Sequence, residues 1–243
     1  MLATGRDRAA LERLAGAGAS TRVLDLDDAS APAGLAAAAG ERFSGALDGL
    51  VIATGSAKPI GPTRTVDLAV LERALRTQLV GALALVQACA ELLDAGDSPS
   101  VVLFSGGGAT APLPRYTAYA LAKVATVRLV ENLALEEPAW KVNAVAPGFV
   151  ATHIHDATLA AGPGLAGAYH DETVSRLEEA VPPTAAAALV VFLLSGESEG
   201  ISGRLISAAW DDWRDEGVRA LLREDDSFGR LRRIDRQQFH ASE

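Results

Sequence analysis

The chain has a single cysteine, few aromatic residues and no long apolar run. Cys89 is the only cysteine among 243 residues, which excludes an internal disulfide and favours a reducing compartment. The longest apolar run, residues 185–194, holds ten residues, about half of a membrane span. Residues 1–10 are polar and charged where a signal peptide would be apolar. These features predict a cytoplasmic protein with no membrane partner.

Positive charge is also scarce. Lysine and arginine number 22 against 31 aspartates and glutamates, which gives a net charge of −9. An acidic balance argues against a nucleic-acid-binding surface. The length, with 49% hydrophobic residues, fits one α/β domain with a large core.

Apolar, β-branched runs alternate with helical patterns along the chain. Strands are expected at residues 22–26, 50–53, 99–104, 141–146 and 204–208. Helices are expected at residues 29–42, 67–93, 119–136 and 184–194. This alternation is typical of a three-layer, doubly wound α/β fold with a parallel sheet. We predict that it spans residues 1–209, followed by a tail, 210–243.

Tyr119 and Lys123 are four residues apart on a predicted helix, so one turn brings phenol and ammonium onto one face. A nearby positive charge favours the phenolate, and we expect it to lower the pKa of Tyr119 from its usual ~10. Such a phenol can exchange a proton with an alcohol or ketone. The same spacing also occurs on ordinary amphipathic helices, so the neighbouring residues decide between a catalytic pair and an ordinary helix face.

Two predicted strands deliver polar residues to the same place. Strand 99–104 ends at Ser105, and strand 141–146 breaks before Thr152. Because the carboxyl ends of parallel strands meet at one edge of a sheet, ligands bind there. We therefore expect four residues at one edge: Ser105, Tyr119, Lys123 and Thr152.

These segments resemble the short-chain dehydrogenase/reductase family, in the family's order and near its spacings. The matching motifs are residues 47–55, the serine strand, the Tyr-x-x-x-Lys pair, residues 142–148 with Thr152, and residues 200–206. The resemblance implies a Rossmann-like oxidoreductase that transfers a hydride between NAD(P) and a secondary alcohol or ketone. In that scheme Tyr119 is the acid/base, Lys123 holds the cofactor ribose and Thr152 contacts the carboxamide.

The resemblance also implies roles for other residues. Arg6 suits a 2′-phosphate, which favours NADP over NAD, and Asp25 matches an adenine contact. Gln78 stands where many members carry asparagine, and we expect it to position Lys123 through water. Further cofactor contacts are implied for Ala53, Gly55, Tyr119, Lys123, Pro147 and Gly148. No metal is expected, since the pair at 153 and 155 has no third ligand at a recognisable spacing.

The serine position departs from the family pattern. Counting back from Tyr119, the usual catalytic serine is Gly106 here, and Ser105 comes one residue earlier. We expect Ser105 to steady the carbonyl oxygen if the three glycines at 106–108 let the loop reposition its hydroxyl.

The amino-terminal part departs further. Family members open with a strand and a glycine-rich turn that cradles the cofactor diphosphate. Residues 1–14 most resemble the second strand and helix, so we expect an N-terminally truncated or rearranged fold. A second alignment starts the turn at Thr4, but Ala9 and Leu11 then occupy glycine positions.

Loss of a central strand would leave two strands with unpaired backbone groups. Three explanations stay open: residues 1–4 pair centrally, a partner chain fills the gap, or the start of the gene is placed too late.

Three classes of function stay open as well. The first is the oxidoreductase. The second is a non-redox isomerase, dehydratase or cyclase that uses no cofactor, and the third is a non-catalytic subunit. The resemblance implies that residues 152–182 form a substrate-covering loop, and an ordinary surface loop explains their composition equally well. We expect a homodimer or homotetramer, with Trp210 and Trp213 packed either on a neighbour or on their own subunit.

Overall fold

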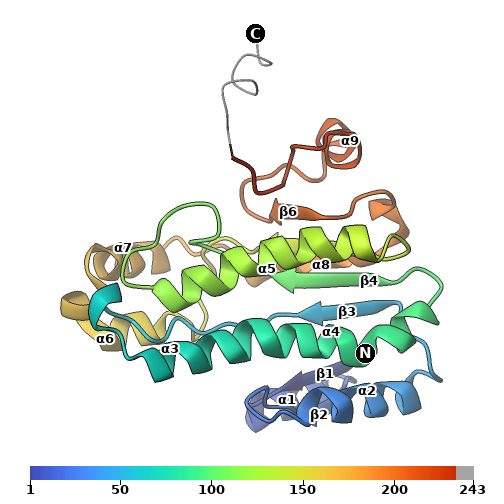
Figure 1. The fold of residues 1–243 in the computed structure, drawn as a ribbon, viewed down its shortest axis with the longest axis horizontal. Coiled ribbons are helices and arrows are strands. Elements are labelled where there is room, and N and C mark those ends of the chain that lie inside the picture. Colours follow the sequence, from blue (N-terminus) through green and yellow to red (C-terminus); the bar gives the residue numbers. More distant parts are fainter. Residues whose placement is uncertain (234–243) are drawn as a thin grey trace.

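The computed structural model describes residues 1–233 as a three-layer α/β fold (Figure 1). All strand pairs are parallel, so the predicted doubly wound architecture is confirmed. The strands are β1 Leu2–Gly5, β2 Ser20–Val23, β3 Gly49–Ile52, β4 Ser100–Phe104, β5 Lys141–Ala146 and β6 Arg204–Ser207.

These strands form two sheets rather than one. β1 pairs only with β2, and the second sheet has the order β3-β4-β5-β6. The explanation in which residues 1–4 pair centrally is therefore wrong, because Leu2 is registered with Ser20 and Gly5 with Val23. The sheet is interrupted between β1 and β3, where the sequence lacks a strand.

Helices cover both faces of the main sheet. α2 Ala31–Arg42, α4 Gly81–Asp94 and α5 Thr117–Glu136 pack on one face, and α8 Pro183–Leu194 packs on the other (Figure 1). Successive residues of β4 serve the two cores in turn, as the strand period of two requires. Val101 and Leu103 belong to the core under α4 and α5, and Val102 belongs to the core under α8. α1 Arg8–Gly16 connects β1 to β2.

The long helix predicted at 67–93 is present with one irregular turn. α3 Leu68–Leu75 is followed by a wider π-helical turn, Arg76–Val80, and then by α4. By length and composition alone the helix Leu68–Asp94 could cross a membrane. Cys89 and Leu93 of α4 are buried in the protein core. Packing in the core therefore explains why α4 is apolar.

The loop predicted at 152–182 is wrong, because two helices lie there. α6 Asp156–Ala166 and α7 Ala168–Leu177 carry glycines at their breaks. Gly162 and Gly167 have φ values of 67° and 65°, which other residues rarely adopt. These glycines interrupt the helical pattern in the sequence without abolishing the helices.

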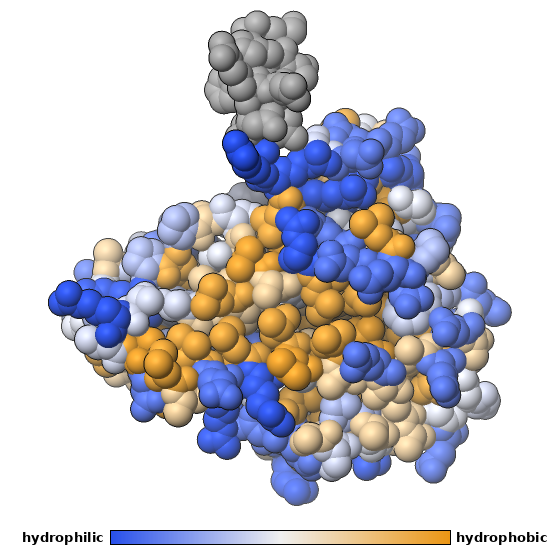
Figure 2. All heavy atoms as spheres, in the orientation of Figure 1, coloured by the Kyte–Doolittle hydropathy of each residue, from blue (hydrophilic) through white to orange (hydrophobic). Residues whose placement is uncertain are grey.

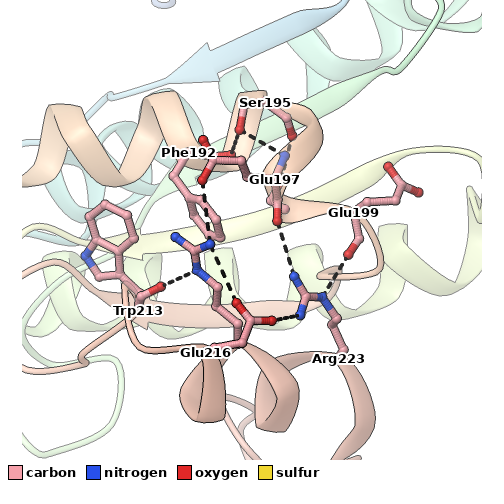
Figure 3. A network of polar contacts seen from close by, with 9 residues as sticks. Phe192, Ser195, Glu197, Glu199, Trp213, Glu216 and Arg223 are labelled. Carbon is pink, nitrogen blue, oxygen red and sulfur yellow. Dashed lines mark hydrogen bonds and ion pairs between the residues drawn. The ribbon is translucent and has the colours of Figure 1, made fainter.

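The first part of the tail packs on its own subunit. Trp213 is 4% exposed, and its ring lies 5.2 Å from that of Phe192 in α8. α9 Glu216–Glu224 follows, and Arg223 donates to the backbone oxygen of Glu199 at 3.1 Å (Figure 3). Trp213 and α9 thus extend the domain beyond the predicted boundary at 209. Residues 234–243 of the predicted tail lie outside the described part.

Candidate active site

Lys123 lies at the carboxyl edge of the main sheet, as predicted. Its Nζ donates hydrogen bonds to the backbone oxygens of Thr54, at 3.0 Å, and Phe104, at 2.9 Å. These carbonyls follow β3 and end β4, so the ammonium joins the two strand ends. The side chain is buried, and burial lowers its pKa to about 8.

Tyr119 shares a face of α5 with Lys123. The Nζ atom lies 5.6 Å from the centre of the tyrosine ring, so the predicted proximity is confirmed. The expected lowering of its pKa is wrong for this structure, because burial, with a smaller effect from Tyr169, raises the pKa of Tyr119 to about 12. Two carbonyls hold the ammonium, while the phenol packs in an apolar cluster. That cluster includes Ala57, Ile60, Leu113, Tyr116, Ile154, Ala157, Ala166 and Tyr169.

Ser105 does not occupy the expected catalytic position. Its Oγ donates to the backbone oxygen of Lys123 at 3.0 Å, and the side chain is 3% exposed. Gly106 faces the tyrosine instead: a β-carbon there would lie 2.6 Å from the Tyr119 hydroxyl. The expected repositioning of Ser105 is therefore wrong, because its hydroxyl is used to tie β4 to α5. The position beside the phenol carries no hydroxyl.

Gln78 is buried in the π-helical turn between α3 and α4. Its Oε1 accepts from the backbone N–H of Ser56 at 3.0 Å, and its Nε2 donates to the Ala74 oxygen at 3.4 Å. These direct bonds fix the segment after β3 rather than Lys123. The wider turn aims the amide at that segment, and such turns are frequent at functional sites.

The implied nicotinamide contacts come together only in part. A β-carbon at Gly55 would lie 3.6 Å from the Nζ of Lys123 and 3.6 Å from Ile154. The segment after β5 therefore reaches the end of β3. Gly148 has a φ of 81° and lies close to Ala209, which turns the chain after Pro147. Thr152 is exposed at the start of that segment.

A cavity of about 1330 Å³ separates β1 from β3. Arg6, Asp25, Ala53 and Gly55 are among the residues that line it. The Asp25 carboxylate accepts from the backbone N–H of Asp27 at 3.1 Å. The residues implied for the two ends of a dinucleotide therefore border one space, and Gly55 in its lining lies near Lys123.

The fit to a dinucleotide is incomplete in the diphosphate region. Helix N-termini bind phosphate through unpaired N–H groups, but Asp7 already caps α1, accepting from the N–H of Ala10 at 3.0 Å. Its carboxylate would also repel phosphate. No glycine-rich turn opens onto the cavity within residues 1–233. The residues present suit the nicotinamide and its ribose, and they do not cradle a diphosphate.

Sequence reasoning missed the residues packed beside Tyr119. Tyr116 donates to the Thr158 hydroxyl at 2.9 Å, and its ring lies 5.0 Å from that of Tyr169. Tyr116 could have been found, because it lies at the N-cap of α5, three residues before Tyr119. Thr158 and Tyr169 lie in α6 and α7, where no periodic pattern marked them.

Comparisons with known proteins agree with this fold. A family model described as enoyl-(acyl carrier protein) reductase matches residues 2–208. A solved structure described as a short chain dehydrogenase/reductase family protein is 27% identical, covers 85% of this chain and 83% of its own, and has a TM-score of 0.69. A comparison with curated protein sequences found no match.

Two further solved structures share the fold. A short chain dehydrogenase/reductase from Saccharomyces cerevisiae is 22% identical, with 89% of this chain and 86% of that chain covered and a TM-score of 0.79. A short chain dehydrogenase from Shigella flexneri 2a, solved in complex with NADP, is 21% identical, with 85% of each chain covered and a TM-score of 0.73. Fold and site together define a Rossmann-like enzyme class. The chain belongs to the short-chain dehydrogenase/reductase family of oxidoreductases.

Proposed function

We propose that the protein is an NAD(P)-dependent oxidoreductase that acts on a secondary alcohol or ketone. One observation carries the proposal: the Tyr119 ring lies 5.6 Å from the Nζ of Lys123 at the carboxyl edge of the sheet and packs in an apolar cluster. Family membership supports the reaction class, and the edge position is where ligands bind in such folds.

Tyr119 is the proposed proton donor in the reduction of a ketone. A pKa of about 12 keeps the phenol protonated at neutral pH, which is the form a donor needs. When the proton leaves, the nearby Lys123 ammonium stabilises the phenolate. The apolar surroundings strengthen that interaction, because they exclude water.

Lys123 also provides the proposed contact to a ribose. An ammonium has three N–H donors, and two of them bind the carbonyls of Thr54 and Phe104. The third has no protein partner among the described residues and suits a ribose hydroxyl beside Gly55. The nicotinamide cofactor supplies the hydride when it is bound. Arg6 in the lining of the cavity supports NADP.

We also propose that two copies associate through α4 and α5. An apolar area extends over these helices in Figure 2. Val80, just before α4, is 55% exposed, and Leu121 and Leu135 of α5 are 46% and 77% exposed. A large exposed apolar patch marks an interaction site. The acidic charge disfavours nucleic acid as a partner, and a cytoplasmic location stays a prediction.

A non-redox enzyme is the second candidate, and one observation favours it: the described residues form no diphosphate cradle. Isomerase, dehydratase or cyclase chemistry at Tyr119 would need no hydride. A non-catalytic subunit remains the third class.

Ligand binding and turnover distinguish the candidates. NADPH and NADH are titrated against the protein while its melting temperature is followed, because a ligand of the folded state stabilises it by mass action. The proposal expects a melting shift, larger for NADPH, and cofactor oxidation with a panel of ketones. Turnover of a substrate with no cofactor present would instead establish the non-redox candidate.

A further inference from the structure

α6 and α7 lie beside the start of α5 at the edge of the sheet (Figure 1). The side of α6 that takes part in this contact is apolar, since Ala157, Ala161 and Ala166 belong to the cluster that contains Tyr119. An apolar wall excludes water and strengthens electrostatic interactions beside it. The position of α6 therefore determines how dry the surroundings of the phenol are.

Two consecutive residues anchor α6 to the start of α5. Tyr116 donates to the Thr158 hydroxyl at 2.9 Å, in the first part of α6, and both residues are 1% exposed. In the last turn of α6, the Arg115 guanidinium donates to the backbone oxygens of Gly164, at 2.9 Å, and Leu165, at 3.1 Å. Each part of the helix thus has its own anchor.

The last turn of α6 has carbonyls that need a donor from outside the helix. The N–H of Gly167 closes this turn on the oxygen of Pro163 at 2.9 Å, and the carbonyls that follow have no helical partner. Arg115 binds two of them through a charged donor, which makes stronger hydrogen bonds than a neutral one. None of the ion pairs within residues 1–233 involves Arg115, so its guanidinium serves this turn.

The backbone on both sides is shaped around the contact. Arg115 has a φ of 73°, which residues other than glycine rarely adopt, and its oxygen accepts from the N–H of Gly61 at 2.8 Å. A β-carbon at Gly167 would lie 2.7 Å from the Nε of Arg115, so glycine is needed for the guanidinium to approach. Backbone held in such a conformation clusters at functional sites.

We propose that Arg115 is a positioning residue, a latch that fastens the last turn of α6 to the start of α5 and so holds the apolar wall against Tyr119. The role rests on the proposed function, in which Tyr119 transfers the proton. Without the latch, water reaches the phenol past Ala166, which is 1% exposed in the closed arrangement. Burial is the main cause that raises the pKa of Tyr119 from 10.0 to about 12, so this pKa should fall when the wall moves away.

Tyrosine nitration tests the latch without an activity assay. The chain has three tyrosines, Tyr116, Tyr119 and Tyr169, and all three lie in this cluster. Tetranitromethane modifies the phenolate, so at pH 8 each unit by which the pKa falls raises the rate about tenfold. In Arg115→Ala we expect Tyr119 to be nitrated at least tenfold faster than in the native chain, and Tyr116 to change less than threefold. Mass spectrometry of peptides assigns the rate to each tyrosine.

Two glycines provide matched variants. Gly162 and Gly167 have φ values of 67° and 65°, so alanine strains the backbone alike at both. No atom lies within 4 Å of a β-carbon at Gly162, whereas one at Gly167 would meet Arg115. Gly167→Ala should therefore speed the nitration of Tyr119 as Arg115→Ala does, and Gly162→Ala should change it less than threefold. Since both single changes break one contact, the double variant of Arg115 and Gly167 should be no faster than either.

Arg115→Gly separates the latch from the stability of the fold. Glycine adopts a positive φ without strain, so this variant removes the guanidinium and relaxes the backbone together. The midpoint of its urea unfolding should be no lower than that of Arg115→Ala, and its Tyr119 should be nitrated as fast as in Arg115→Ala.

Turnover of an apolar ketone is a separate readout. Arg115→Ala should raise KM at least tenfold, because the wall no longer closes on the substrate, and should change kcat less. Absence of turnover in the native protein would contradict the proposed function, while the nitration rates would still decide whether Arg115 holds the wall.

Three results would overturn the proposal. The first is nitration of Tyr119 that stays within threefold of the native rate in both Arg115 variants. The second is equal acceleration at all three tyrosines, which would show general unfolding. The third is acceleration in Gly162→Ala that matches Gly167→Ala, which would show that backbone strain, and not the contact with Arg115, exposes the phenol.

Discussion

Gly106 faces the hydroxyl of Tyr119 with no room for a side chain, since a β-carbon at position 106 would lie 2.6 Å from that hydroxyl. The proposed proton carrier is thus positioned against a backbone that leaves no room for a side chain. Gly107 offers a matched comparison, because no atom lies within 4 Å of its β-carbon position.

Replacing Gly106 by alanine should displace the phenol and impair turnover. A misplacement of about 1 Å can cost roughly 100-fold in rate, so we expect kcat to fall by one to two orders of magnitude. Gly107→Ala should change kcat less than threefold, on the order of what a harmless surface change does. Equal kcat values for the two variants would show that the contact does not matter.

Ser105 should behave as a structural residue. Its buried hydroxyl bonds to the Lys123 oxygen at 3.0 Å, so Ser105→Ala is expected to lower the free energy of unfolding by about 1 kcal/mol. Turnover should stay within a few-fold of the native value. Urea unfolding and steady-state kinetics check this, and a large loss of kcat at unchanged stability would make the serine catalytic after all.

Lys123 should make stability rise with pH in the alkaline range. Burial lowers its pKa from 10.5 to about 8 in the folded state, so between these values the unfolded chain binds more protons. The free energy of unfolding then rises with pH, by at most about 1.4 kcal/mol per unit. Below pH 8 the full cost of burying the charge is present.

Unfolding measured at pH 7, 8, 9 and 10 in the native protein and in Lys123→Met checks this sign. The range stops at pH 10 because of Tyr119, whose pKa burial raises from 10.0 to about 12. Above pH 10 this tyrosine ionises in the unfolded chain before it does in the folded protein, which lowers the free energy of unfolding. The advantage of the variant should shrink from pH 8 to pH 10. A constant difference would mean that the amine titrates normally.

The apolar area over α4 and α5 should control association. Leu121→Glu combined with Leu135→Glu places charges on that face, and we expect the molecular mass in solution to fall to that of a monomer. Val191→Glu is the control, since Val191 is 67% exposed on α8. Light scattering distinguishes the outcomes, and an unchanged mass in the double variant would exclude this face.

The sequence predicted the elements whose patterns are local. The apolar run at 99–104 and the spacing of Tyr119 and Lys123 placed both of these residues at the edge of the sheet where they lie. α6 and α7 were missed because Gly162 and Gly167 interrupt their pattern. The raised pKa of Tyr119 could not be predicted, since it depends on burial by residues such as Tyr169, which folding brings together from distant positions.

The amino-terminal region was predicted in one respect only. Residues 1–14 showed that a strand and a glycine-rich turn are lacking. They did not show that the sheet is interrupted between β1 and β3. Backbone pairing depends on the register between strands that are distant in the sequence. β1 pairs with β2 and does not close the gap between β1 and β3.

The most direct test of the central claim is turnover of a ketone after Tyr119→Phe, with Tyr116→Phe as the matched control. Both tyrosines lie near the start of the same helix, and Tyr116 bonds to Thr158. Tyr119→Phe should lower kcat by about 10²- to 10⁴-fold, and Tyr116→Phe by less than about tenfold. Native turnover in Tyr119→Phe would contradict the account.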